Sequence, residues 1–302
     1  MNPIRLVYWH TTTDNYGDLL SPFLVYELSG CEIIQKNYFV GNFKSHFYHT
    51  IHSLLHGDWN FRSRYHFPFE STVLGIGSIL YTGNHRSLIW GAGFMSSDER
   101  CTGGTVLALR GKYSLEMIKQ QIANGDSISL SKNVVLGDPA LLLPLILSVS
   151  KHKQYKLGII PHFSEVDWFK ANYGDRFHII DLRSTDIEGI TRDITSCENI
   201  LSTSLHGIIV PHAYGIPALW MEHTGLESYT KGFKFRDYFS SVAIDEYRPI
   251  KNLEEVLESE ETAIKVLHTY KDVSLPNTDV AIIQKRLLSV APFRLRKDFV
   301  IE

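Results

Sequence analysis

A run of hydroxyl side chains leads to a histidine in the segment STSLHG, residues Ser202 to Gly207. An apolar run typical of a strand precedes this segment, and an apolar run typical of a helix follows it. His206 would therefore stand at the amino end of a helix, where the positive end of the helix dipole lowers the pKa of an imidazole and keeps the ring neutral. A neutral imidazole can exchange a proton or a hydrogen bond with a substrate. His206 is the first candidate catalytic residue, with Ser204 and Gly207 as neighbouring substrate contacts.

Cationic side chains in two segments suit an anion. Arg110 in ALRGK comes between a predicted strand and a predicted helix, and its planar guanidinium can hold a phosphate or carboxylate with two hydrogen bonds. Lys234 and Arg236, in the segment KGFKFRD, can close over an anion from the other half of the chain. We expect Arg110 and Lys234 to face a cleft with little packing of their own. Two alternatives stay open, namely that Arg110 pairs with Glu116 on the surface and that the lysines are only solvated.

A short polar segment, NYGD, follows the first predicted strand. Asn15, Gly17 and Asp18 would offer backbone N–H groups and a carboxylate to a cleft at the carboxyl end of that strand. The alternative is that Asp18 only caps the following helix and Gly17 only allows a turn. In the turn LGDP, Asp138 is expected to be structural, and His212 is expected to pack in the core.

Two glycine-rich loops close predicted strands further along the chain. GIGS contains Gly75, Gly77 and Ser78, and WGAG contains Gly91 and Gly93. Glycine lets a ligand approach the backbone closely, so both loops are candidate walls of a site, although a tight turn alone would explain either one. Neither loop is a dinucleotide fingerprint, because position 80 is a leucine where the motif needs a third glycine. The sequence therefore disfavours nicotinamide and flavin cofactors.

Composition excludes several other classes of function. The three cysteines, at positions 31, 101 and 197, form no CxxC pair and are expected to be reduced core thiols. No cluster of His, Cys and carboxylates has metal-ligand spacing, so no metal is expected. With 30 basic and 33 acidic residues, the chain lacks the charge of a dedicated nucleic-acid binder. Residues 1–9 lack the apolar region of a signal peptide and no stretch has the length of a membrane span, so we expect a cytosolic protein.

Strand and helix patterns alternate along the chain, which predicts mostly parallel sheets. In the first half, apolar runs predict strands at Ile4–Trp9, Thr72–Ile76, Ser87–Trp90 and Val106–Leu109. Helices are predicted from Asp18 to Leu28, ended by Gly30, and from Lys112 to Ile122. In the second half, strands are predicted at Leu157–Pro161, Phe177–Leu182, Asn199–Thr203 and Ala218–Met221, with helices at Gly207–Tyr214 and Leu253–Tyr270. Residues 40–68 show no clear periodicity, and their structure stays open.

A chain of 302 residues is long for one hydrophobic core, so two domains are expected. The alternation of strands and helices restarts after a polar stretch at residues 151–156, which we interpret as a linker. The prediction is an α/β fold with two doubly wound, Rossmann-like domains, residues 1–150 and 151–280, that face a cleft. Residues 281–302 are expected to pack back on the first domain. Ligands in such sheets bind beyond the carboxyl ends of the strands, where the motifs above lie.

Taken together and in this order, NYGD, GIGS, WGAG, ALRG, LGDP, STSLHG and KFRDYF resemble the motifs of polysaccharide pyruvyltransferases, over roughly residues 5–240. The resemblance implies a fold similar to GT-B glycosyltransferases, with the acceptor on the N-terminal domain and the donor on the C-terminal domain. It implies transfer of pyruvyl from phosphoenolpyruvate to two hydroxyls of a sugar, as a cyclic ketal, without a metal or another cofactor. Arg110, His206 and Lys234 match the positions that hold the phosphate and carboxylate of the donor.

Two positions depart from the pattern that this family shows. Ser204 stands where many members have an arginine, so one anion contact comes from elsewhere or is absent. Lys112 stands where a proline is usual, and it either supplies the missing charge or lies on the surface.

The implied reaction needs an acid that protonates the enol carbon and a base that takes a proton from the sugar hydroxyl. We expect the acid near His206 and assign the base to Asp18 from its place in the cleft. The expected partner is a saccharide of a surface or capsular polysaccharide precursor, free or lipid-linked. Two alternatives are a GT-B glycosyltransferase that uses nucleotide sugars and a non-catalytic glycan-binding subunit of a polysaccharide assembly.

The C-terminal segment Leu287–Asp298 carries three basic residues after an apolar stretch, namely Arg294, Arg296 and Lys297. The simpler interpretation is a helix end that packs on the first domain. The alternative is that these residues also contact the anionic inner face of a membrane, which would make the protein peripheral there.

Overall fold

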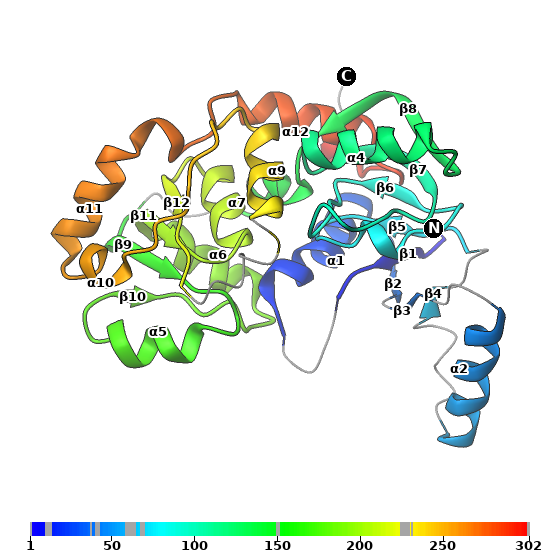
Figure 1. Cartoon of the computed structure of the whole chain (residues 1–302), viewed down its shortest axis with the longest axis horizontal. Helices are drawn as coiled ribbons and strands as arrows, with labels where there is room; N and C mark the ends of the chain where they lie inside the picture. Colours follow the sequence, from blue (N-terminus) through cyan, green and yellow to red (C-terminus); the bar gives the residue numbers. More distant parts are fainter. Residues whose placement is uncertain are drawn as a thin grey trace.

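The computed structural model describes residues 2–9, 14–36, 38–39, 43–57, 65–66, 70–148, 152–223, 230 and 232–300, and the statements below refer to those residues. The fold is mixed α/β, with one parallel sheet of six strands and one of four. Figure 1 shows the two sheets side by side, with α1 (Tyr16–Ser29) between them. Among the described residues, no helix is long and apolar enough to cross a bilayer.

The larger sheet has the strand order β2-β1-β5-β6-β7-β8, and every neighbouring pair is parallel. Its strands are β1 (Ile4–Val7), β2 (Ile33–Lys36), β5 (Val73–Leu74), β6 (Leu88–Trp90), β7 (Gly104–Leu109) and β8 (Ile128–Leu136). Sequence analysis missed β2 and β8, which are the two edges of the sheet. Edge strands are not covered like central ones and need no continuous apolar run, and the middle of β8 is polar, with Ser131, Lys132 and Asn133.

The smaller sheet has the order β10-β9-β11-β12 and is also parallel throughout. Its strands are β9 (Tyr155–Ile160), β10 (His178–Ile179), β11 (Cys197–Ser202) and β12 (Ala218–Trp220), at the four predicted places. In both sheets the first strand of the chain lies between the second and the third. This order creates a topological switch point at the carboxyl ends of β1 and β5 in one sheet, and of β9 and β11 in the other.

The helices follow the predictions with two corrections. Gly30 ends α1 in the left-handed conformation, but Asn15 caps its start, because the Asn15 side chain accepts a hydrogen bond from the Gly17 N–H. The predicted helix Leu253–Tyr270 is divided, because Ser259 caps a second helix. The remaining helices are α2 (Phe43–Leu55), α4 (Lys112–Ala123), α5 (Val166–Tyr173), α6 (Ile187–Thr195), α7 (His206–Ala213), α9 (Phe233–Ser241), α10 (Leu253–Val256), α11 (Glu260–Thr269) and α12 (Val280–Ser289).

Short elements complete the fold. The 3-10 helices are η1 (Leu80–Thr82), η2 (Pro139–Leu145), η3 (Lys271–Val273) and η4 (Lys297–Phe299). The strands β3 (Tyr38–Phe39) and β4 (Tyr65–His66) form a separate parallel pair beside α2 in the chain, in the region whose structure the sequence left open.

One hydrophobic core joins the two sheets. It contains Leu20 and Leu24 of α1, Leu142 of η2, Ile208 of α7 and Tyr238 of α9, all fully buried, and these elements come from both halves of the chain. The helices α1 and α7 both contact η2, and the Tyr16 hydroxyl is 2.8 Å from the hydroxyl of Thr191 in α6. The halves are therefore packed together over a continuous apolar surface.

The last residues of the chain lie against the first half. Helix α12 contacts η2 and β8, and the Trp90 indole N–H donates a 2.9 Å hydrogen bond to the Leu287 carbonyl. Phe293 packs edge-on against Trp90, and the Arg296 N–H donates to the Leu28 carbonyl. Arg296, one of the three basic residues in this segment, is thereby part of a packed junction.

Candidate active site

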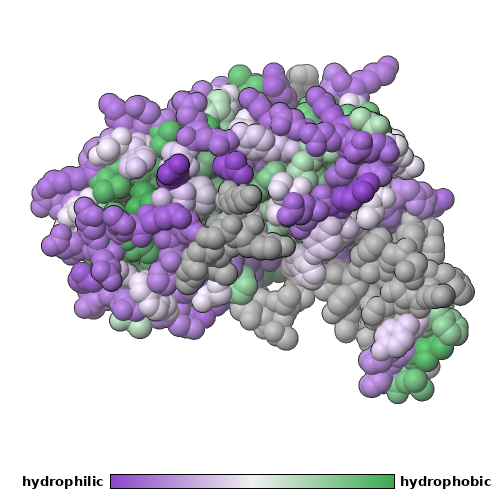
Figure 2. Space-filling model, viewed as in Figure 1, coloured by the Kyte–Doolittle hydropathy of each residue, from purple (hydrophilic) through white to green (hydrophobic). Residues whose placement is uncertain are grey.

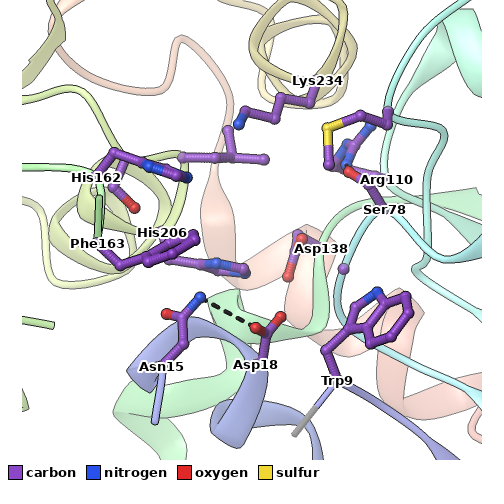
Figure 3. Close-up of a pocket in the computed structure, with 14 residues that line it drawn as sticks. Trp9, Asn15, Asp18, Ser78, Arg110, Asp138, His162, Phe163, His206 and Lys234 are labelled. Atoms are coloured by element: carbon purple, nitrogen blue, oxygen red, sulfur yellow. Dashed lines mark hydrogen bonds between the residues drawn. The ribbon is translucent and has the colours of Figure 1, made fainter. Parts of the chain in front are cut away.

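A cavity of about 280 Å³ lies where the carboxyl ends of the two sheets meet. Figure 3 shows that its side chains converge from both halves of the chain. The loops after β1, β5, β9 and β11 all contribute, so both topological switch points open into one space. The lining residues are Trp9, Asn15, Asp18, Gly77, Ser78, Met95, Arg110, Asp138, His162, Phe163, Ser204, Leu205, His206 and Lys234.

The cavity gathers eight of the residues that the sequence proposed for a site. They are Asn15, Asp18, Gly77, Ser78, Arg110, Ser204, His206 and Lys234. Five proposed glycines do not line it and instead let neighbouring groups pack closely. Gly75 lies against Ser21, Gly91 against Pro139, and Gly207 against Ser202 and Ile160, while Gly17 and Gly93 lie under site side chains.

Gly17 and His206 connect two motifs that are far apart in the sequence. A Cβ atom at position 17 would lie 2.2 Å from Nδ1 of His206, which no real contact allows. The imidazole therefore rests directly on the backbone of α1, and glycine is required because His206 occupies the space of a side chain. The role of Gly17 is to seat the histidine of the other half of the chain.

His206 is neutral in the free site. Its Nε2 atom is buried and has no hydrogen-bond partner among the described residues. Burial, together with the positive charges of Arg110 and Lys234, lowers the pKa of His206 to about 3. The sequence predicted a neutral ring from the helix dipole, but burial is the larger cause. His206 therefore places a neutral ring with an unpaired nitrogen beside the cavity that it lines.

Arg110 is held by protein contacts, so the expectation of a loosely packed arginine is wrong. The side chain is 1% exposed, and its Nε atom donates to Oδ2 of Asp237 at 3.0 Å. One terminal nitrogen donates to the Ser78 hydroxyl at 2.8 Å, and the other donates to the Phe94 carbonyl. The structure pairs Arg110 with Asp237 and not with Glu116 at the surface. The guanidinium has five N–H groups, so these three hydrogen bonds leave two N–H groups that can donate to a ligand in the cavity.

Asp237 anchors this arginine and was missed by sequence analysis as a site residue. It is fully buried and also accepts hydrogen bonds from the backbone N–H and the hydroxyl of Ser114, at 2.9 and 2.7 Å. These contacts join the start of α4 to α9 across the two halves. A Cβ atom at Gly93 would lie 2.4 Å from the Arg110 guanidinium carbon, so glycine there gives the arginine its place. The aspartate in KFRD was the available signal.

Lys234 enters the cavity from the first turn of α9. Gly232 precedes this helix in the left-handed conformation, and Lys234 is 8% exposed, so it too is more packed than the sequence suggested. Figure 3 shows its side chain reaching across the cavity toward the side of His162 and His206, with its amino group pointing away from Arg110. Its charge lowers the pKa values of both Asp18 and His206.

Two carboxyl groups with raised pKa values face these cations. Burial raises the pKa of Asp18 to about 6, against the opposing effects of a 3.0 Å hydrogen bond from Asn15 and of the Lys234 charge. Burial also raises the pKa of Asp138 to about 6, against a hydrogen bond from the Ala140 N–H and the charge of Arg110. Asp138 was expected to be only structural. It does cap η2, but it also lines the cavity and is a second titratable group there.

The loop after β9 supplies His162 and Phe163, which sequence analysis did not single out. The His162 N–H donates to the Thr203 hydroxyl at 2.7 Å, and this hydroxyl donates to the buried carboxylate of Glu165. The loop is thereby tied to the STSLHG segment. Because β9 was predicted correctly, the residues just past its carboxyl end were the signal that could have identified this wall.

The remaining titratable candidates are structural. His212 is buried, its Nδ1 is 3.0 Å from the Tyr238 hydroxyl, and burial lowers its pKa to about 4. The three cysteines are buried free thiols. No group of three or more His, Cys, Asp or Glu side chains within the described residues has a metal-binding arrangement.

The arrangement as a whole favours an anionic ligand. The starts of α1, α7 and α9 all contribute lining residues, and helix N-termini present backbone N–H groups and positive dipole ends to a ligand. Arg110 and Lys234 add two cations, and the two carboxyls with pKa values near 6 add groups that can exchange protons near neutral pH.

Comparison with known proteins identifies the family. A family model described as polysaccharide pyruvyl transferase matches residues 37–225, which include Arg110, Asp138 and His206 but not Asp18 or Lys234. An uncharacterized protein, L143, of Acanthamoeba polyphaga mimivirus is 30% identical over 192 residues, which cover 61% of this chain and 63% of that protein. The match thus spans less than two thirds of the length of this relative, and no solved structure matches the chain. Because the family model covers more than half of its residues, the chain belongs to the polysaccharide pyruvyl transferase family.

Proposed function

We propose that this protein transfers pyruvyl from phosphoenolpyruvate to two hydroxyls of one sugar, forming a cyclic ketal. The observation that carries the proposal is a small cavity in which two cations and a neutral histidine face two carboxyls with pKa values of about 6. An anionic donor needs the cations, and a reaction through a protonated enol needs the carboxyls. Family membership supports the same reaction class.

Phosphoenolpyruvate matches the charges of the site. Its phosphate and carboxylate together carry about three negative charges, and charge-assisted hydrogen bonds from Arg110, Lys234 and the helix N-termini can neutralise them. Ser204 takes the place of an arginine found in many members, and its hydroxyl offers the donor a weaker, uncharged contact. We assign the donor's anionic groups to the region between Lys234 and Arg110.

Donor binding also changes the protonation of the site. A negative ligand raises the pKa values of nearby groups, because it favours their more positive forms. The carboxyls of Asp18 and Asp138, with pKa values of about 6 before binding, then become protonated near neutral pH. The acid is therefore a carboxyl group, and His206 is the group that receives a hydroxyl proton. This reverses the roles that the sequence suggested for Asp18 and His206.

The reaction balances with these groups. A carboxyl proton adds to C3 of phosphoenolpyruvate, which becomes a methyl group, and the positive charge develops at C2. A sugar hydroxyl bonds to C2 and gives its proton to His206. The bond from C2 to the phosphate oxygen then breaks, and the second hydroxyl closes the ring. Of the two hydroxyl protons, one restores the proton that the carboxyl gave to the methyl group, and the other leaves with phosphate.

We further propose a GT-B-like arrangement with a saccharide acceptor bound from the side of the N-terminal half. Trp9, in the N-terminal half, is a partly exposed aromatic side chain at the cavity and offers a large apolar face to a sugar ring, and Phe163 offers a second one from the other half. The acceptor is a precursor of a surface or capsular polysaccharide, either free or lipid-linked, and the reaction takes place in the cytoplasm. A cavity of about 280 Å³ suits phosphoenolpyruvate better than the larger nucleotide sugar of the alternative glycosyltransferase.

Incubation of the protein with phosphoenolpyruvate and a panel of sugars tests the proposal. We expect release of phosphate together with a sugar product heavier by about 70 mass units, as ketal formation requires. Separate thermal-shift measurements with phosphoenolpyruvate and with nucleotide sugars identify the donor, because a ligand that binds only the folded state stabilises it. Stabilisation by a nucleotide sugar alone, without phosphate release from phosphoenolpyruvate, would contradict the proposal.

A further inference from the structure

The helix α2 presents an apolar stripe to solvent. Phe47, Tyr48, Ile51, Leu54 and Leu55 recur at spacings of three and four residues and therefore lie on one face of the helix. All five are exposed, and Leu55 is 77% exposed. On the other face, the small polar side chain of Ser53 is 4% exposed. The helix thus turns a serine inward and its large apolar side chains outward, which is the reverse of a helix that covers a core.

Figure 1 shows α2 standing away from the two sheets, at one end of the molecule. Figure 2 shows apolar surface gathered on one side of this projecting helix, with more polar surface on its other side. The stripe is also remote from the C-terminal end of the chain, which lies at the opposite edge in this view. An exposed apolar stripe on a projecting element is typical of a surface that contacts another phase or molecule.

The charged residues of this segment indicate which kind of molecule contacts the stripe. No Asp or Glu occurs between Glu32 and Asp58, while the helix and its C-terminal flank contain Lys44 and four histidines, at positions 46, 49, 52 and 56. Lys44 is the one charged residue in the sequence of this helix, and a helix with aromatic and leucine side chains on one face and no acidic residue matches the interface of an anionic bilayer. With 13 residues it is too short to span the membrane, so it would lie in the plane of the interface.

A second copy of the chain fits the stripe less well. Five partly exposed side chains of this size offer on the order of 500 Å². A stable dimer buries roughly 800 Å² on each partner. The surface is therefore small for a dimer but sufficient for a shallow, reversible membrane contact.

We propose that α2 docks this protein on the surface of an anionic lipid bilayer, with Ile51, Leu54 and Leu55 inserted among the lipids. The contact does not depend on the proposed transferase activity, and its failure would leave that activity untouched. It differs from the membrane contact suggested by the C-terminal basic residues, because it uses another element at another end of the molecule.

Co-sedimentation of the full chain with vesicles tests the proposal. Vesicles of phosphatidylcholine alone are compared with vesicles of equal parts phosphatidylcholine and phosphatidylserine. We expect binding to the anionic vesicles that weakens as salt is added. The triple variant Ile51→Ser, Leu54→Ser, Leu55→Ser should reduce the partition coefficient on the order of tenfold or more, because it removes the inserted groups.

Two control variants separate the stripe from general surface effects. The variant Leu145→Ser, Ile282→Ser, Val300→Ser also removes three exposed apolar side chains, and it should bind as the parent does. The variant Arg294→Ala, Arg296→Ala, Lys297→Ala should keep most of the binding. Circular dichroism checks that each variant is folded.

Three results would overturn the proposal. One is a parent chain that sediments with neither type of vesicle. Another is an α2 variant that binds as tightly as the parent while the C-terminal variant does not. The third is light scattering that shows a dimer of the parent chain and a monomer of the α2 variant, which would assign the stripe to a second copy.

Discussion

Replacement of Asp237 by alanine should destabilise the whole protein, because it isolates a buried charge. Asp237 is fully buried and accepts three hydrogen bonds, from the Arg110 guanidinium and from the N–H and hydroxyl of Ser114. Without this carboxylate, Arg110 stays buried at 1% exposure and loses its direct ion-pair partner, so only the more distant carboxyls of Asp138 and Glu99 act on its charge. The two halves of the chain also lose a fully buried ion pair between them.

The expected cost follows from the burial of both partners. Removal of one member of a buried ion pair costs about 3–5 kcal/mol, because the remaining charge is neither solvated nor paired. Proteins are stable by about 5–15 kcal/mol, so this one change would remove a large share of the stability. The exposed pair between Asp167 and Arg183 gives the matched control, and Asp167→Ala should cost far less than Asp237→Ala, because a solvent-exposed ion pair contributes little to stability.

Denaturant unfolding followed by circular dichroism measures these changes. A double-mutant cycle with Arg110→Met isolates the interaction, because the double variant has no orphaned charge. We expect the double variant to lose clearly less stability than the sum of the two single variants. A cost below about 1 kcal/mol for Asp237→Ala, or strict additivity in the cycle, would refute the reasoning from burial.

Lys234→Met should weaken phosphoenolpyruvate binding roughly ten- to a hundred-fold in calorimetry, because one charge-assisted hydrogen bond is lost, whereas the exposed Lys265→Met should not change it. Asp18→Asn should stabilise the protein above pH 6 by up to about 3 kcal/mol, because the folded state raises the pKa of this carboxyl to about 6. The protonated carboxyl of the parent costs no stability below the pKa of the unfolded chain, about 4, and its ionisation destabilises the folded state as the pH rises from there through 6. In thermal unfolding, Asp18→Asn and the parent should therefore be equally stable near pH 3, and the advantage of the variant should grow as the pH rises above about 4. Gly17→Ala should lower kcat strongly with a smaller effect on stability, since the added methyl displaces the His206 ring, and steady-state kinetics measures this. Activity should be unchanged in a chelator, as the described residues offer no metal cluster.

Each of these expectations can fail in a recognisable way. Equal donor affinity for Lys234→Met and Lys265→Met would remove Lys234 from the donor site. A stability gain of Asp18→Asn that is the same at pH 3 and pH 8 would show that the carboxyl does not titrate with a raised pKa. A Gly17→Ala variant with parental kcat would show that the ring tolerates displacement, and chelator-sensitive activity restored by a divalent ion would reveal a missed metal.

The central strands and the helix starts were predictable because their signals are local. Buried strands such as β9 and β11 are short apolar runs, and Gly30 ends α1 by its own conformational freedom. The edge strands β2 and β8 were not predictable in the same way, because one-sided burial leaves no continuous apolar run. Likewise, nothing local marks the break between α10 and α11 except the serine at position 259.

The site was predictable in its residue types but not in its pairings. Motif positions identified Arg110, His206 and Lys234, since strand ends and helix starts are where ligands bind. That Arg110 is bound by Asp237, or that His206 rests on Gly17, depends on contacts between residues more than 100 positions apart. The raised pKa of Asp138 has the same origin, because burial is a property of the assembled fold.

The shared core of the two halves has a consequence for how substrates are chosen. Domains joined by a small polar interface can swing apart, but a large apolar junction such as that of α1, η2 and α7 resists such motion. The width of the cavity between the two halves is then fixed before a ligand binds. No binding free energy is spent on shifting the protein from an open form to a rare closed form. Core residues such as Leu142 and Ile208 would then determine the size of the ligands that fit, because they maintain the distance between the two halves. Changes of volume there would alter which molecules enter, although neither side chain lines the cavity.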